Sequence, residues 1–418
     1  MWYRRLPWWA IGISIFVLVA SVFAVDPIWN AATHAPVVEA RLAQPPAYLA
    51  IAPFVNILDT LTLLTVGQHI AIGLWAIGLY IVVRLLRVLR HGLRLRREAL
   101  AALGFLAGLF VVYAIGAMAP RPMAQLVVSD ETVLSADFHA HTKYSHDGRS
   151  GWDESDVRAW HRGAGFDVAY ITDHRTFDGA ERGVAGNASQ AGQSEGTLLL
   201  QGLEAVLRGQ HVNILSAGRR FKGLMTPDLR DVDEQGLALA SMIANNEPVV
   251  IQTIPDDLSK ILPAGDPGTA GARAIELVDG SPRGLSQGRR ERLRILRLAD
   301  SLDLALVAGS DNHGWGRAAP GWTLMRIGGW RGMSTDSLAG AIETILRLGR
   351  NGSTLVVERR VADGNNPLSL LLAGVVIPWR MLTTLSTDER VVWLIWTWAI
   401  VVIARGVRMS RLRPSRAA

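Results

Sequence analysis

Residues 137–148 read Asp-Phe-His-Ala-His-Thr-Lys-Tyr-Ser-His-Asp-Gly, the densest run of His and Asp in the chain. His139 and His141 stand two residues apart, so on a strand their side chains point to the same side and can both reach one ion. Gly148 permits a turn that brings Asp147 back toward the two histidines. A His-X-His pair taken alone is more often part of a packed surface strand than of a metal site. A metal site is indicated only if other parts of the chain supply further ligands.

Three further motifs place ligand-type residues at the ends of other apolar runs. Tyr-Ile-Thr-Asp-His ends at His174, and Gly-Leu-Glu ends at Glu204; His-Val-Asn-Ile-Leu then begins at His211, on the next strand of an expected hairpin. Val-Ala-Gly-Ser-Asp-Asn-His-Gly offers Asp311 and His313, again at strand spacing. Each motif alone is weak, since a single Glu in a strand usually faces water. Together the four motifs indicate one cluster of His, Asp and Glu side chains.

The region from about residue 127 to residue 361 alternates β-rich runs with amphipathic runs, which is the pattern of an α/β domain. The expected strands are 133–138, 167–171, 197–206, 249–252, 274–278 and 305–308. The expected helices are 153–162, 233–244, 285–302 and 337–348. Six or more strand–helix steps favour a barrel over an open sheet, and barrels carry their sites at the C-terminal ends of the strands. The four motifs lie at those ends.

The two ends of the chain are apolar. Hydrophobic residues make up 49% of the sequence and the mean hydropathy is +0.21, values typical of a chain that lies partly in lipid. We expect membrane regions at 1–125 and 363–418, on either side of an α/β domain at 126–362. The expected spans are 8–25, 69–89, 99–119 and 391–404, with 47–66 as an interfacial or re-entrant piece and 368–383 as an interfacial helix or a second span.

Charge divides unevenly between the centre and the ends. The chain has a net charge of +6, but residues 120–366 carry 27 Lys+Arg and 31 Asp+Glu, net −4, while the remainder carries 16 and 6, net +10. A nucleic-acid partner is therefore not expected, because a polyanion would meet a negative domain. The basic clusters at 84–97 and 405–416 adjoin apolar runs, as in cytoplasmic loops. We expect an integral protein of a bacterial inner membrane, with both termini inside and the central domain outside.

Taken together, the four motifs resemble those of the PHP (polymerase and histidinol phosphatase) metallohydrolases, over about residues 133–315. The resemblance implies a distorted (β/α)7 barrel, here flanked by transmembrane helices, that holds two or three divalent metal ions. It implies four ligands for one metal: His139, His141, Glu204 and Asp311. Glu204 would bridge to a second metal. Three ligands are implied for another metal: Asp147, His174 and His313.

The remaining metal site of the family takes one histidine from the strand after the glutamate and one from a later strand. His211, with Asn213 beside it, fits the first position, but the later stretch contains Gln252 and Ile254 and no histidine. We therefore expect two firmly held metals and a third site that is weakened or absent. The chain has no cysteine, so nitrogen and oxygen ligands must hold the ions, and zinc, manganese and iron all suit them.

The resemblance also implies a hydrolase in which a metal-activated water attacks a small-molecule phosphoester. Asp311, Asp147 and His313 are the candidates for moving the proton. The His-Val-Asn-Ile-Leu spelling resembles a branch of PHP-like proteins that includes carboxylic and carbamate ester hydrolases, so that ester class is an alternative. A metal-binding membrane sensor or scaffold without turnover is another, because Gln252 and Ile254 stand where a ligand is usual.

Overall fold

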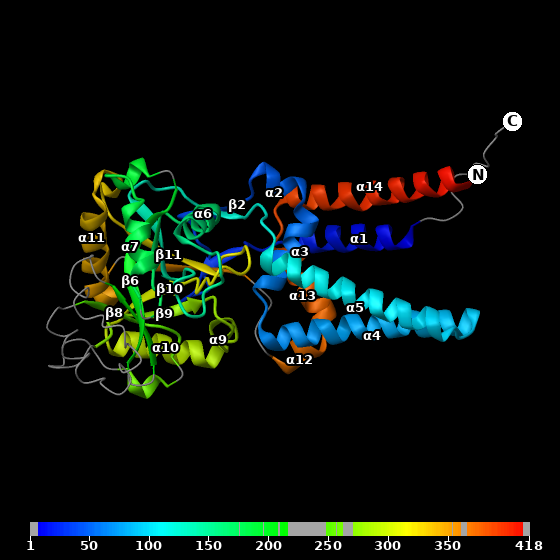
Figure 1. Cartoon of the computed structure of the whole chain (residues 1–418), viewed down its shortest axis with the longest axis horizontal. Helices are drawn as coiled ribbons and strands as arrows, with labels where there is room; N and C mark the ends of the chain where they lie inside the picture. Colours follow the sequence, from blue (N-terminus) through cyan, green and yellow to red (C-terminus); the bar gives the residue numbers. More distant parts are fainter. Residues whose placement is uncertain are drawn as a thin grey trace.

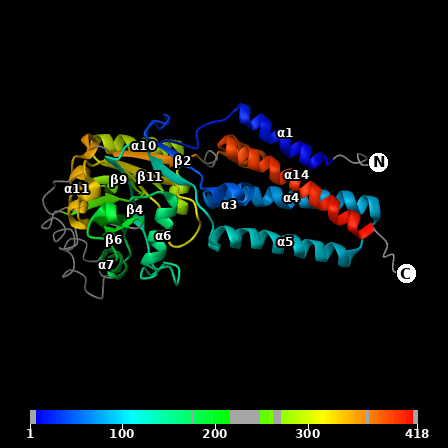
Figure 2. The same cartoon turned by 90° about the horizontal axis from the view of Figure 1, so that it is seen from above.

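The computed structural model describes residues 7–174, 176–194, 196–207, 210–215, 248–255, 257–261, 271–352, 354–360 and 366–412. Two parts follow one another along its longest axis, a mixed α/β domain and a group of long helices (Figure 1). The long helices extend away from the α/β domain in both views (Figures 1 and 2).

A mixed sheet forms the centre of the α/β domain. Its strands within the described residues are β1 (Ile28–Asn30), β4 (Val133–Ala140), β5 (Val168–Ile171), β6 (Leu198–Leu207), β7 (Gln210–Leu215), β8 (Val249–Gln252), β9 (Ala274–Asp279), β10 (Ala305–Gly309), β11 (Gly321–Arg326) and β12 (Thr354–Arg359). Their order is β1-β12-β11-β4-β5-β6-β7-β8-β9-β10. A separate pair joins β2 (Ala40–Ala43) to β3 (Gln125–Val128). All six strands expected from the sequence are present.

The strands from β4 to β10 curl until β10 returns beside β4. An isolated bridge joins Ala140 to Asn312, and the Asp311 N–H donates to the His139 carbonyl at 2.8 Å. β4–β5, β5–β6, β8–β9 and β9–β10 pair in parallel, whereas β7 is antiparallel to both neighbours. The expected barrel-type α/β fold is confirmed, in a curled and partly open form, because the β6–β7 hairpin replaces one strand–helix step.

Amphipathic helices cover the sheet because each buries one apolar stripe. The helices of the domain are α6 (Glu154–Ala164), α7 (Asp178–Ala185), α9 (Pro282–Leu285), α10 (Arg289–Ser301) and α11 (Thr335–Arg347), with short 3₁₀ turns η1 (Ala191–Gln193), η3 (Leu258–Lys260), η4 (Trp330–Gly332) and η5 (Gly349–Asn351). The prediction of one continuous helix at 285–302 is wrong at its N-terminal end, because α10 begins only at Arg289. Gly288 before it is extended, with φ −81° and ψ 156°, and separates α9 from α10. The helix expected at 233–244 lies outside the described residues.

Within the described residues, three helices are long and apolar enough to cross a membrane: α4 (Val66–His91), α5 (Leu95–Met118) and α14 (Thr387–Leu412). α4 and α5 form an antiparallel hairpin, in which Tyr80 stacks on Phe105 at 4.4 Å and Arg84 pairs with Glu98 near the turn. Their apolar side chains face outward; Phe110, for example, is 74% exposed. Such a surface is unfavourable in water and suits a lipid environment.

Shorter helices lie between the long ones and the α/β domain or pack beside them. They are α1 (Trp8–Val22), α2 (Pro46–Ala50), α3 (Ala52–Thr62), α12 (Pro367–Leu371) and α13 (Ala373–Thr383). The segment expected at 47–66 thus forms two short helices, and so does the segment at 368–383. A membrane span requires about 20 residues, and the helices of both pairs are shorter than that. A second C-terminal span is therefore not found in the described residues.

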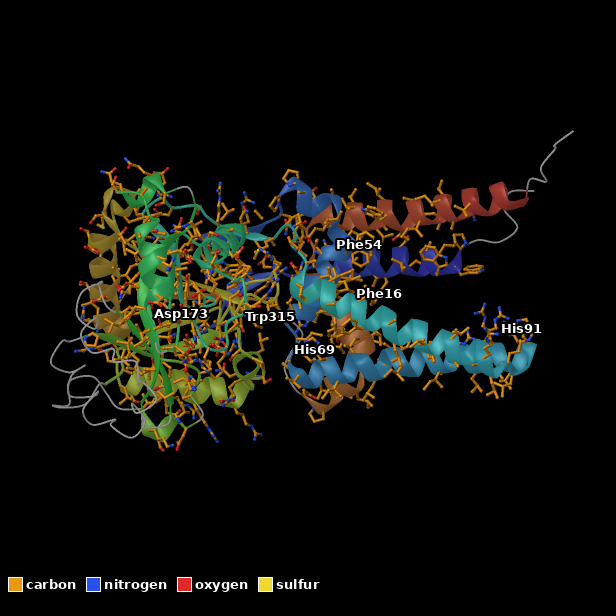
Figure 3. The ribbon with its side chains drawn as sticks, viewed as in Figure 1. Phe16, Phe54, His69, His91, Asp173 and Trp315 are labelled. Atoms are coloured by element: carbon orange, nitrogen blue, oxygen red, sulfur yellow. The ribbon has the colours of Figure 1, made fainter. Side chains whose placement is uncertain are left out.

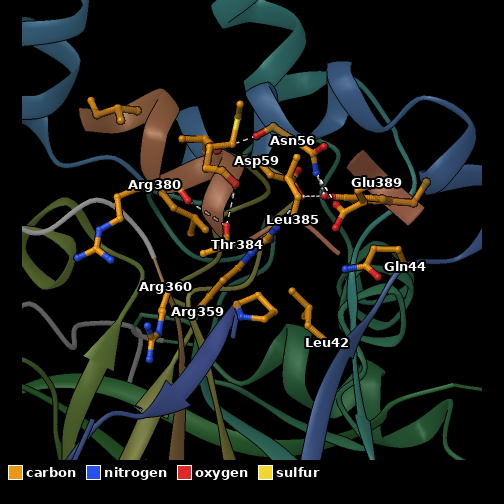
Figure 4. A pocket seen from close by; sticks show the side chains of 16 residues that line it. Leu42, Gln44, Asn56, Asp59, Arg359, Arg360, Arg380, Thr384, Leu385 and Glu389 are labelled. Carbon is orange, nitrogen blue, oxygen red and sulfur yellow. Dashed lines mark hydrogen bonds and ion pairs between the residues drawn. The ribbon is translucent and has the colours of Figure 1, made fainter. Parts of the chain in front are cut away.

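A buried polar network joins the α/β domain to these short helices. The Asp59 carboxylate of α3 accepts from Arg121 at 3.1 Å and from Arg359 of β12 at 3.2 Å. Asn56 of α3 donates to Glu389 of α14 at 2.7 Å. Asn56, Asp59, Arg359 and Glu389 line a pocket at this junction (Figure 4). Because buried and mutually satisfied polar groups rigidify their surroundings, the network fixes the domain against the helices.

Replacing Asp59 by alanine would leave Arg121 and Arg359 buried without their shared carboxylate. We expect the free energy of unfolding in detergent to fall by about 3 kcal/mol, because an uncompensated buried charge remains. Guanidinium unfolding followed by tryptophan fluorescence measures the change.

Asp300→Ala is the matched control, since this carboxylate is 63% exposed where it meets Arg350. An exposed pair contributes only about 0.5 kcal/mol. Equal destabilisation by the two variants would contradict the role given to Asp59.

Candidate metal centre

The candidate ligands meet at one edge of the curled sheet. His139 lies near the end of β4 and His141 just after it, His174 follows β5, and Asp311 follows β10. The C-terminal ends of neighbouring parallel strands share an edge, so side chains from distant parts of the chain converge there. Glu204 joins them from within β6, where an isolated bridge pairs it with His174.

The first group of ligands is compact and almost fully buried. His139, His141, Glu204 and Asp311 each offer one atom, and these atoms all lie within 4.8 Å of one another. The Nε2 atom of His139 lies 3.0 Å from Glu204 Oε2 and 3.2 Å from Asp311 Oδ1. The Nε2 atom of His141 lies 3.2 Å and 3.3 Å from the same two oxygens. The structure therefore brings together the four residues that the sequence grouped around one metal.

The second group surrounds the Asp147 carboxylate beside the first. Asp147 Oδ2 lies 3.1 Å from His313 Nε2 and 3.4 Å from His174 Nε2. His174 Nε2 is also 3.2 Å from Glu204 Oε2, so Glu204 stands between the two groups. His146, which is largely exposed, lies near Asp147 and His174 and is a possible further donor that the sequence analysis did not assign.

The third expected position is incomplete. His211 is half exposed and meets Glu204, and with His174 these residues form another group of donor atoms. Gln252 stands in the stretch where the motif resemblance would lead us to expect a histidine, and its side-chain N–H donates to the His211 carbonyl at 2.8 Å. Ile254 is buried and offers no donor. A third ion would therefore have fewer ligands than the other two.

Two backbone features shape this site. A Cβ atom at Gly148 would lie 1.9 Å from the Thr142 carbonyl oxygen, so only glycine allows the turn that returns Asp147 to the histidines. Asp311 has φ 46°, a conformation that non-glycine residues rarely adopt. Strain of this kind is concentrated at functional sites, where the surrounding structure compensates for it.

Burial and hydrogen bonding determine the charge state of the carboxylates. Burial opposes ionisation of Asp147, but hydrogen bonds from His174 and His313 outweigh it and hold the pKa of that carboxyl well below its usual value. Burial also opposes ionisation of Glu204, but the charge and hydrogen bond of His139 lower its pKa. Both groups therefore favour the ionised form, which is the form that binds metal.

The donor set fits divalent cations. His141 is fully buried, and neither its Nδ1 nor its Nε2 atom has a hydrogen-bond partner. Leaving a buried polar atom without a hydrogen-bond partner costs free energy, so such atoms are rare unless they have another role. A divalent ion lying among His141 Nε2, Glu204 and Asp311 would give the Nε2 atom a partner.

Sequence reasoning missed the residues behind His139. Glu276 Oε1 and Asp279 Oδ2 of β9 lie 3.0 Å and 3.5 Å from His139 Nδ1, on the side of the ring away from Glu204. Burial raises the pKa of the Glu276 carboxyl well above its usual value; it also opposes ionisation of Asp279, but contact with His139 lowers the pKa of Asp279. The only signal in the sequence is the presence of two acidic residues in an otherwise apolar strand.

Asp137 has a structural position beside the cluster. One of its oxygens contacts His161 Nε2 of α6 at 2.7 Å, and the other accepts from the Ser310 and His139 N–H groups. It therefore ties β4 to α6 and to the loop after β10. No ligand role follows from these contacts.

Comparison with known proteins gave matches only among solved structures. No family model and no curated protein matches the chain. PsfC from Pseudomonas syringae is 15% identical, covering 60% of this chain and 99% of its own, with a TM-score of 0.36. A putative metal-dependent phosphoesterase from Bifidobacterium adolescentis is 17% identical, covering 50% and 94%, with a TM-score of 0.31.

A two-domain protein from Bacteroides vulgatus that contains a predicted PHP-like metal-dependent phosphoesterase is 16% identical, covering 54% of this chain and 64% of its own, with a TM-score of 0.32. Two of these three solved structures are described as metal-dependent phosphoesterases, one of them PHP-like.

Proposed function

We propose that this chain is a membrane-anchored, metal-dependent hydrolase that cleaves phosphoesters of small molecules. The main support is the convergence of seven His, Asp and Glu side chains, among which buried His141 makes no hydrogen bond through either ring nitrogen. The phosphoester class rests on the resemblance of the four motifs. Residues 126–362 form the catalytic domain in this proposal, and residues 1–125 and 363–418 form the membrane regions.

Two divalent ions account for most of the donors. His139, His141, Glu204 and Asp311 would hold one ion, and Asp147, His174 and His313 would hold the other, with Glu204 between the two groups. When bound, such ions lower the pKa of a water molecule and neutralise charge on phosphoryl oxygens. Asp147, the most exposed of these carboxylates, is placed to move the proton at the mouth of the site, with His313 and Asp311 beside it.

A carboxylic or carbamate ester hydrolase is a second candidate because of the His-Val-Asn-Ile-Leu spelling from His211. A metal-binding scaffold without turnover is another, because Gln252 and Ile254 occupy positions where a ligand is usual. Release of phosphate from phosphomonoesters, and of alcohol from carboxylic esters, separates the three possibilities. A scaffold would bind metal and release neither product.

The double variant His139→Ala/His141→Ala removes two nitrogen donors from the compact group. We expect at most residual metal after dialysis and a loss of phosphoester hydrolysis, because both the ion and its activated water depend on these ligands. Elemental analysis and phosphate release on the detergent-purified protein measure the two effects.

The control is His91→Ala, an exposed histidine at the end of the helices remote from the α/β domain (Figure 3). Its metal content and rate should match those of the unaltered protein. Wild-type hydrolysis by the double variant would end the proposal.

Glu276 is expected to orient His139 from behind. Its Oε1 atom lies 3.0 Å from His139 Nδ1, and an N–H group at Nδ1 that donated to it would leave the Nε2 lone pair directed at Glu204 and Asp311. Glu276→Leu should weaken metal binding by about 10- to 100-fold, as the loss of such supporting contacts does in other metal sites. Glu276→Gln keeps an acceptor oxygen and should lose much less. Competition with a chelator measures the affinities, and equal losses in both variants would refute the orienting role.

The sidedness of the membrane insertion is also a proposal. The basic turn between α4 and α5 lies at the opposite end of the hairpin from the α/β domain, and Figure 3 places His91 there. Positive charge remains in the cytoplasm, so the catalytic domain is placed outside. The protein is then an integral protein of a bacterial inner membrane.

Alkaline phosphatase fused after residue 125 should be active, because this enzyme matures only outside the cytoplasm. The same reporter fused after Gly92, in the turn, should be inactive. The reverse pattern would place the catalytic domain inside.

A further inference from the structure

The loop that carries His313 is attached directly to the membrane helices. Three residues after His313, the Gly316 N–H donates to the Ala117 carbonyl of α5 at 2.8 Å. Gly316 has φ 76°, and a Cβ atom there would lie 2.4 Å from Cγ2 of Thr62 in α3. The loop therefore lies against the ends of α3 and α5 with no room for a larger residue.

This contact lies at the boundary of the expected hydrocarbon layer. The charged residues of α5 end at Glu98, and the helix then continues uncharged to Met118. A helix needs about 20 residues to cross a hydrocarbon core of ~30 Å, which places Ala117 at the end nearest the α/β domain. Three residues of extended chain span at most about 11 Å, which limits the distance from Gly316 to His313. The candidate metal centre thus lies close to the depth of lipid headgroups.

The side chains of this loop suit the membrane surface. Trp315 is 51% exposed, and Figure 3 shows it at the face of the α/β domain that meets the helices, with Asp173 deeper in the domain. The Arg149 guanidinium lies 5.3 Å from the centre of the Trp315 ring. The backbone N–H of Arg149 donates to the His313 carbonyl at 3.0 Å, so Arg149 is directly adjacent to a candidate ligand. Tryptophan concentrates at membrane interfaces, and guanidinium groups bind phosphate.

A second arginine adds positive charge at the same place. Arg317 lies over the Trp152 ring at 5.8 Å and makes no salt bridge with a carboxylate in the part of the chain that the structure describes. Burial and the positive charges of Arg121 and Arg149 lower the pKa of Arg317, while the nearby charge of Asp156 acts in the opposite direction. Arg121 is itself paired with Asp59, so Arg149 and Arg317 are the cations that an incoming anion would meet.

We infer that the substrate is an anionic membrane amphiphile, a lipid whose headgroup phosphoester reaches the metal centre from the bilayer surface beside Arg149, Trp315 and Arg317. The inference rests on the proposed function and narrows its substrate class. In the reaction the water oxygen bonds to phosphorus as the P–O bond to the lipid alcohol breaks. One proton of the water passes to the alcohol oxygen, and phosphate leaves with the other.

The test compares two substrates with the same phosphomonoester group, phosphatidic acid in mixed detergent micelles and water-soluble glycerol phosphate. The full chain, loaded with manganese or zinc, should show the higher kcat/KM for phosphatidic acid. Arg317→Gln and Trp315→Ala should each lower the ratio of the two kcat/KM values by about tenfold, through the KM for phosphatidic acid. Arg350→Gln, which removes an exposed arginine that pairs with Asp300, should leave the ratio unchanged.

The outcomes separate the inference from the proposed function. Glycerol phosphate cleaved as efficiently as phosphatidic acid, or a ratio unaffected by both loop variants, overturns the inference alone. Release of phosphate from neither substrate by the metal-loaded protein overturns the proposed function and the inference with it. Because Trp315 is exposed and Arg317 makes no salt bridge with a described carboxylate, both variants should fold.

Discussion

The crowding of ionisable groups in a buried space is the constraint on which the site depends. Glu204 and Asp311 lie within 3.3 Å of His141 Nε2, and His141 is fully buried. Several charges kept out of water are costly unless they are paired or coordinate a metal. The arrangement is therefore hard to explain as packing alone and fits a centre that holds divalent cations.

The surrounding structure keeps these groups in place through contacts away from the ligand atoms. Asp137 ties β4 to α6 through His161, and Glu276 lies behind the His139 ring. Asp173 accepts from the N–H and hydroxyl groups of Thr142, which fixes the loop after β4. Such supporting contacts matter because imidazole and carboxylate ligands must be oriented before an ion can bind them well.

The helices and the α/β domain are joined by direct contacts. Asp59 of α3 pairs with Arg121 and Arg359, and the loop from His313 to Arg317 lies against α3 and α5. Both contacts lie at the end of the helices nearest the domain, so the metal centre is held at a fixed height above the expected membrane. If the proposed hydrolase activity holds, this position favours substrates that lie in the membrane surface.

The four motifs, the strands that carry them and the long apolar helices could be predicted from the sequence, because strand alternation, turn residues and the length of apolar runs are local properties. The sequence also placed Glu204 and Asp311 together, through the motif resemblance. Only the tertiary structure decided which distant residues surround them. Glu276 meets His139 across 137 positions, and Arg359 meets Asp59 across 300. Such contacts depend on the order of the strands and the curl of the sheet, which no local pattern encodes.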